Sequence, residues 1–234
     1  MQKFTKTIAT VMLIVAVVGA AGCNKNKEPN NGTYNGHDYI DLGLPRGTLW
    51  ATCNVGADNP EGYGDHFAWG ETQPKAAYND SNYIYSNGGY DQFTKYCTKS
   101  EFGYNGFTDD LKTLQPSDDA ATVNWGEGWR TPTINEWIEL VTKCSYSFTT
   151  RNGVNGCVFT GRNGNSIFLP VRGRIGDDKS SIEDDIGNYW STSLNKGLPF
   201  YAKGFQFIVD NDCDIYNDFS RCAGYSVRPV HDFK

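Results

Sequence analysis

The chain has 234 residues, a net charge of −6, 38% hydrophobic and 14% aromatic residues, and seven cysteines. Its length suits one domain of ordinary size, and its apolar content excludes a disordered chain. The acidic balance without a basic stripe excludes a nucleic-acid partner, because phosphate backbones are bound by clusters of Lys and Arg.

The first 22 residues predict a signal peptide. Lys3 and Lys6 precede an apolar run over 8–18, which is too short to span a bilayer core of about 30 Å. Small residues at 19–22 lead to Cys23 in a pattern that resembles a bacterial lipobox, in which the cysteine is lipidated and becomes the first mature residue. The alternative is a plain secretory signal with a cysteine nearby. Removing two lysines and no acid changes the net charge from −6 to −8.

Residues 23–36 are polar, rich in Asn and Gly, and lack aliphatic side chains, which predicts a flexible tether. From residue 37 onward short apolar runs alternate with turns, so we expect one domain over 37–234. Asn-Gly pairs recur along the chain, and this pair tolerates the positive φ angles of tight hairpin turns. The domain is therefore expected to contain β hairpins.

Three elements can be placed from local patterns. A short helix is expected to begin near Asp118-Asp119, where carboxylates suit the positive end of the helix dipole. A longer helix follows Thr133, because Thr133 and Glu136 form a capping box and the apolar residues 134, 137, 138 and 141 lie on one helix face. A hairpin is expected between 157–160 and 166–169.

If Cys23 is lipidated, six cysteines remain in a compartment that permits disulfides. Fifteen pairings are possible, and pairs close in sequence are the simplest expectation. These are Cys213 with Cys222, Cys144 with Cys157, and Cys53 with Cys97. The six cysteines show no C-x-x-C spacing, which argues against a zinc site or a redox motif.

Several stretches together resemble the Fibrobacter succinogenes major paralogous domain of exported Bacteroidetes lipoproteins. The resemblance covers 37–230 and is carried by 39–45, 47–57, 63–71, 118–122, 128–133, 165–170, 189–193 and 226–230. It implies a lipid-anchored protein of the cell envelope, expected in the outer membrane. Surface display stays open, because surface-exported members often carry acidic residues after the lipidated cysteine, whereas Asn24-Lys25-Asn26-Lys27 follows here.

The segment from Gly128 to Trp137 is also similar to the formylglycine-generating enzyme family. That likeness implies an α+β fold of the C-type-lectin kind, with a twisted antiparallel sheet, two helices, long loops and neighbouring termini. This branch of the fold includes the variable proteins of diversity-generating retroelements, which bind ligands near the C-terminus. A role as such a variable protein is one expectation.

The resemblance implies core positions at Ala202, Phe205 and Phe207. It implies a ligand-binding face for a glycan or a protein at positions where family members differ, namely Tyr201, Lys203, Gln206, Asp210, Asp214, Tyr216, Asp218, Phe219 and Tyr225. Aromatic side chains suit recognition because they give a large contact area at low entropy cost. A core role for most of these aromatic residues is the alternative.

Other functions find less support in the sequence. An enzyme of the formylglycine-generating type and a structural envelope or pilus component are the alternatives, but no catalytic residues are predicted and no cofactor is expected. His66 lacks a nucleophile motif and suits a structural role. Residues 210–214 resemble the start of an EF-hand, but Ile215 and Arg221 stand where glycine and glutamate are needed, so only a looser calcium site stays open.

Overall fold

The computed structural model describes residues 31–176, 185–209 and 213–232, without the side chains of 214–216. The predicted signal peptide, the lipidation site Cys23 and Asp210 lie outside the described residues. Within the described ranges, no helix is both long enough and apolar enough to cross a membrane.

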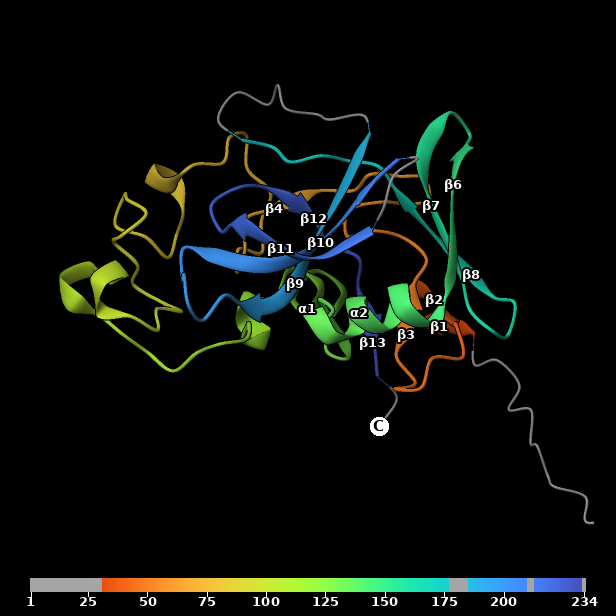
Figure 1. Ribbon diagram of the computed structural model, residues 1–234, viewed down its shortest axis with the longest axis horizontal. Helices are drawn as coiled ribbons and strands as arrows, with labels where there is room; N and C mark the ends of the chain where they lie inside the picture. The colour runs from red at the N-terminus through yellow and green to blue at the C-terminus, as the bar shows by residue number, and fades with distance from the viewer. Residues whose placement is uncertain (1–30, 177–184, 210–212, 233–234) are drawn as a thin grey trace, which may run out of the picture.

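The strands in the described part of the chain form three β-sheets, which make up the body of the domain (Figure 1). The first sheet has the order β1 (Gly32–Tyr34), β2 (His37–Asp41), β3 (Leu49–Ala51), β13 (Val230–His231) and β5 (Trp129–Arg130). The second has the order β11 (Cys213–Ser220), β10 (Tyr201–Ile208), β9 (Ile186–Leu194), β12 (Tyr225–Ser226) and β4 (His66–Phe67). The third is β6 (Ser145–Arg151), β7 (Val154–Thr160) and β8 (Ser166–Pro170).

The described residues also form two α-helices, α1 (Ala120–Trp125) and α2 (Ile134–Lys143). Short 3-10 turns occur at η1 (Asp80–Asn82), η2 (Ser100–Phe102), η3 (Tyr104–Gly106) and η4 (Pro116–Asp118). Among the strands of the described residues, every pair is antiparallel except β12 with β9. The domain is therefore α+β and mainly antiparallel.

Both predicted helices are confirmed, and their caps explain where they begin. Thr133 accepts a hydrogen bond from the backbone N–H of Glu136, and the Glu136 carboxylate accepts one from the N–H of Thr133. The Asp119 side chain caps α1 by accepting from Ala121 N–H. Each cap satisfies backbone donors that a helix start leaves unpaired.

The predicted hairpin is also confirmed, with Cys157 opposite Leu169 and Thr160 opposite Ser166. The end of the tether needs correction. Residues 32–34 form β1 and pair with β2 through a turn in which Asn35 and Gly36 have φ of 48° and 82°. The Asn-Gly turn closes a hairpin here, so the ordered chain begins before residue 37.

Helix α2 packs against β9, β10 and β11 and carries the centre of one hydrophobic cluster. Trp137 is fully buried, stacks on Phe205 at 4.7 Å between ring centroids, and donates from its indole N–H to the carbonyl of Trp190. Ala202, Phe205 and Phe207 are fully buried, as expected. The second cluster lies around Trp69, Trp190 and Phe219.

The predicted disulfides do not form: no disulfide joins any of the six cysteines in the described part of the chain. Cys213 begins β11 and Cys222 follows its end, so about 23 Å of extended strand separates them, whereas a disulfide needs Cα atoms within about 7 Å. Cys157 lies opposite Phe148, about 13 Å along β6 from Cys144. Cys53 and Cys97 pack in different hydrophobic clusters.

The fold instead brings Cys157 of β7 together with Cys213 of β11. The two thiols interact in the same hydrophobic cluster, and this interaction, followed by burial, raises the pKa of Cys157. We expect oxidised glutathione to convert this pair, and not Cys213 with Cys222, into a disulfide. Peptide mass spectrometry after alkylation checks this. A Cys213–Cys222 cross-link, or two alkylated thiols after full oxidation, would contradict it.

Candidate ligand-binding surface

Strand β10 places the predicted ligand-binding residues on two opposite faces. Side chains alternate along a strand, so Tyr201 and Lys203 lie on one face of β10, whereas Gln206 lies on the other. Helix α2 covers the first face beyond Lys203, where Phe205 is buried. The predicted residues therefore do not form one continuous face.

Two of the predicted binding residues belong to the core. Phe219 is 6% exposed and Tyr225 is 5% exposed. Phe219 lies opposite Ala202 in the β10–β11 ladder and stacks on Tyr225 at 4.5 Å between centroids. Because Ala202 points inward, its cross-strand neighbour does as well. The prediction of ligand contacts at Phe219 and Tyr225 is therefore wrong, and the core alternative holds for both.

The face that carries Tyr201 offers a charged pair. Lys203 lies opposite Asp218 in the ladder, and its Nζ is 2.6 Å from the Asp218 carboxylate. Both side chains stay partly open to solvent. An ion pair in this position presents N–H donors and carboxylate acceptors beside the Tyr201 ring.

The opposite face carries a row of amides. The Gln206 amide donates a hydrogen bond to Asn188 of β9 and accepts one from Asn217 of β11, and both hydrogen bonds are 2.8 Å long. Asp214 is the backbone partner of Gln206, and Tyr216 belongs to the same strand. The Gln206 amide is thus engaged in holding three strands together.

Tyr201 belongs to an aromatic patch that the sequence does not predict. It consists of Tyr90, Phe102, Phe200 and Tyr201, with Phe200 in the middle. The Phe200 ring lies 4.3 Å from Tyr201, 5.3 Å from Phe102 and 6.4 Å from Tyr90. Tyr90 is 61% exposed. Three segments distant in sequence thus place aromatic rings at one surface.

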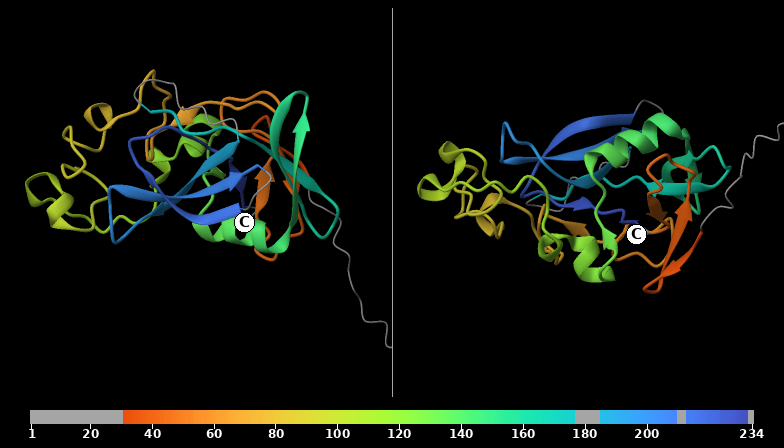
Figure 2. Two further views of the ribbon diagram at one scale, coloured as in Figure 1. Left: turned by 45° about the horizontal axis from the view of Figure 1, so that its top comes forward. Right: turned by 90° about the horizontal axis from the view of Figure 1, so that it is seen from below.

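The patch depends on the long excursion 71–118, drawn yellow to green in Figure 1, which projects to one side of the sheet in every view (Figures 1 and 2). The buried Arg221 joins this excursion to the C-terminal strands. Its guanidinium donates to the carbonyls of Lys95, Tyr96 and Pro199. The Thr98 hydroxyl donates a 2.9 Å hydrogen bond to the Lys196 carbonyl, which is a second link between the excursion and the C-terminal part of the chain.

Two further hollows in the surface have polar side chains in their linings. One of about 490 Å³ is lined by Tyr34, Trp129 and His231, but the neighbouring Arg130 is held by Glu136 and Asp232. Burial would raise the pKa of Glu136 by itself, yet the Arg130 and Thr133 contacts lower it. Arg130 and Glu136 are therefore committed to structure.

The second hollow, of about 250 Å³, is lined by His66, Lys75 and Arg172. Burial and the Arg172 charge lower the pKa of His66 to about 4, so this ring is neutral near pH 7. Across the described ranges, no group of three or more His, Cys, Asp or Glu side chains is arranged to hold a metal ion.

Comparison with protein-family models, curated proteins and solved structures finds no match to this chain.

Proposed function

We propose that this chain is a lipid-anchored envelope protein that binds a glycan through the aromatic patch and the Lys203–Asp218 pair. The domain is proposed to be of the C-type-lectin kind, consistent with its antiparallel sheet, two helices and long excursion. The observation that supports binding most directly is the gathering of partly exposed rings from three segments beside a charged pair.

The chemistry of this surface favours a sugar. Tyr90 and Tyr201 offer flat apolar faces, and a sugar ring has an apolar C–H face of similar size. Lys203 supplies donors and Asp218 supplies acceptors for hydroxyl groups within the same stretch of sheet. The rings are placed by a buried cation and by the sheet, so little order has to be gained when a ligand binds.

The glycan is sought by screening the protein on an array of envelope and mucosal glycans, followed by calorimetry on each hit. Tyr90→Ser and Tyr201→Ser are each expected to weaken binding about tenfold or more, because an aromatic anchor contributes more than about 1.4 kcal/mol. Tyr146→Ser is the matched control, since Tyr146 is 37% exposed on β6, outside the patch. Equal affinity in all three variants would reject the patch as the site.

Other outcomes separate the remaining alternatives. Binding of a protein but no glycan, with loss in the same two variants, would keep the surface and change the ligand class. Stable co-purification with an envelope assembly, unaffected by these variants, would favour the structural role. Adenine-directed variation in the 3′ coding end would support a retroelement variable protein. Mass spectrometry of the mature N-terminus checks for lipid on Cys23.

A further inference from the structure

The described chain begins at a point that is firmly attached to the domain. The Asn31 side-chain oxygen accepts hydrogen bonds from the backbone N–H of Asp41, at 2.7 Å, and from the amide of Asn165, at 3.2 Å. Asn163 and Asn165 both donate to the carbonyl of Asp41. The loop 161–165, between β7 and β8, is therefore held beside the place where the tether enters the domain.

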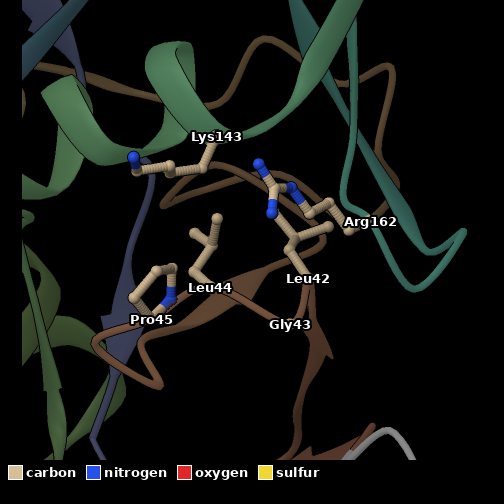
Figure 3. A pocket seen from close by; sticks show the side chains of 6 residues that line it. All are labelled: Leu42, Gly43, Leu44, Pro45, Lys143 and Arg162. Carbon is tan, nitrogen blue, oxygen red and sulfur yellow. The ribbon is translucent and has the colours of Figure 1, made fainter.

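A small pocket of about 140 Å³ lies next to this entry point (Figure 3). Its apolar lining comes from Leu42, Leu44 and Pro45, and its basic lining comes from Lys143 at the end of α2 and Arg162 in the loop 161–165. Figure 3 shows both basic side chains on the same side of these apolar residues. Among the ion pairs of the described residues, none involves Lys143 or Arg162.

A third basic residue adjoins the pocket. Arg46 follows Pro45, its side chain is 58% exposed, and its contact with Glu139 is long, at 4.0 Å. Basic side chains above an apolar floor complement a phosphate attached to an apolar group. The mature chain as a whole is acidic, so this basic face stands apart from the charge of the rest of the molecule.

We infer that this face rests on the membrane and that Lys143 and Arg162 bind the phosphate of an anionic lipid headgroup. The inference rests on the proposed lipid anchor at Cys23. Eight residue steps separate Cys23 from Asn31, which span at most about 28 Å when extended and about 16 Å on average for a flexible chain. The anchor thus holds the pocket within easy reach of the headgroups.

The tether, like the face around Lys143 and Arg162, carries a net positive charge. Lys25 and Lys27 stand against one acid, Glu28, between the lipidation site and Asn31. A basic segment close to an anionic leaflet is attracted to it, and the attraction falls off within about one Debye length. The orientation therefore places the excursion 71–118, which carries Tyr90 and Phe102, away from the anionic surface, because this excursion and β1 lie at opposite ends of the molecule in Figure 1.

The test uses the full lipidated chain reconstituted in vesicles of phosphatidylcholine alone or mixed with phosphatidylglycerol. Amide hydrogen exchange is measured for peptides that cover 42–46 and 161–165. Exchange there is expected to slow only in the phosphatidylglycerol vesicles. Lys143→Gln combined with Arg162→Gln is expected to lower the ratio of docked to free domain about 25-fold, since each basic residue contributes about fivefold.

The matched control is Lys112→Gln with Lys196→Gln, which removes the same charge at two exposed positions in another part of the domain. Equal exchange in both vesicles, equal loss in the control, or the same protection by inorganic phosphate alone would overturn the inference. A mature N-terminus without lipid would instead reject the proposed anchor, and the N-terminal mass is measured on the same sample.

Discussion

Replacing Arg221 with methionine is expected to lower the free energy of unfolding by about 3–5 kcal/mol. Arg221 has 0% exposure, and its guanidinium donates to Tyr83 Oη as well as to carbonyls of the excursion. It also lies over the Phe93 ring, at 4.4 Å from the centroid. Methionine fills much of the volume but leaves the buried carbonyls without donors. Urea unfolding followed by tryptophan fluorescence measures the loss.

Two further variants make this prediction specific. Arg221→Lys is expected to be nearly as damaging, because a single ammonium group cannot reach acceptors that are arranged for a planar guanidinium. Arg162→Met, at an exposed arginine, is expected to change stability by less than about 0.5 kcal/mol. A loss for Arg221→Met no larger than for Arg162→Met would show that the buried guanidinium is not what holds the excursion.

Protonation of His66 is expected by itself to lower the free energy of unfolding by about 3 kcal/mol as the pH is lowered from 6.5 to 4. The ring is buried and donates from Nε2 to the Gly173 carbonyl. Burial first, and the Arg172 charge second, lower the pKa of His66 to about 4. Between that value and the unfolded value near 6.5, the unfolded chain binds the additional proton, so acid favours unfolding. Urea titrations at several pH values measure this slope.

The control for this effect is His66→Gln, which keeps a side-chain N–H donor but does not titrate. This variant is expected to lose most of the slope between pH 6.5 and 4, and the part that stays comes from His37, whose pKa is also lowered by burial. At lower pH a further loss is expected in both proteins, because the pKa values of Asp118 and Glu136 are lowered in the fold. Identical slopes above pH 4.5 in the two proteins would contradict the assignment to His66.

Elements held by contacts within a few residues were predictable from the sequence. The capping box at Thr133 and Glu136 sets the start of α2, and the turn residues 161–165 between two apolar runs set the hairpin of β7 and β8. Asn35-Gly36 closes a hairpin for the same local reason, although the composition of 23–36 predicts a tether that runs through this turn.

The candidate site was only partly predictable, because it depends on register between distant strands. Tyr201, Lys203 and Asp218 do come together at one surface. Gln206 faces the other side, while Phe219 and Tyr225 are buried. A sequence without a known register cannot show which alternate residues of β10 and β11 are covered. Tyr90 and Phe102 could not be assigned to the site either, since they reach it only through the excursion.

The sequence by itself determined the helix starts, the hairpin turns and the acidic character, because each follows from near neighbours or from composition, whereas the α+β class was implied by a family resemblance. The tertiary structure alone decided which thiols meet, as with Cys157 and Cys213, and which aromatic rings remain exposed. It also placed Lys143 and Arg162 beside the entry of the tether. These outcomes rest on contacts between residues far apart in the chain, and such contacts are set by packing of the whole core rather than by any local pattern.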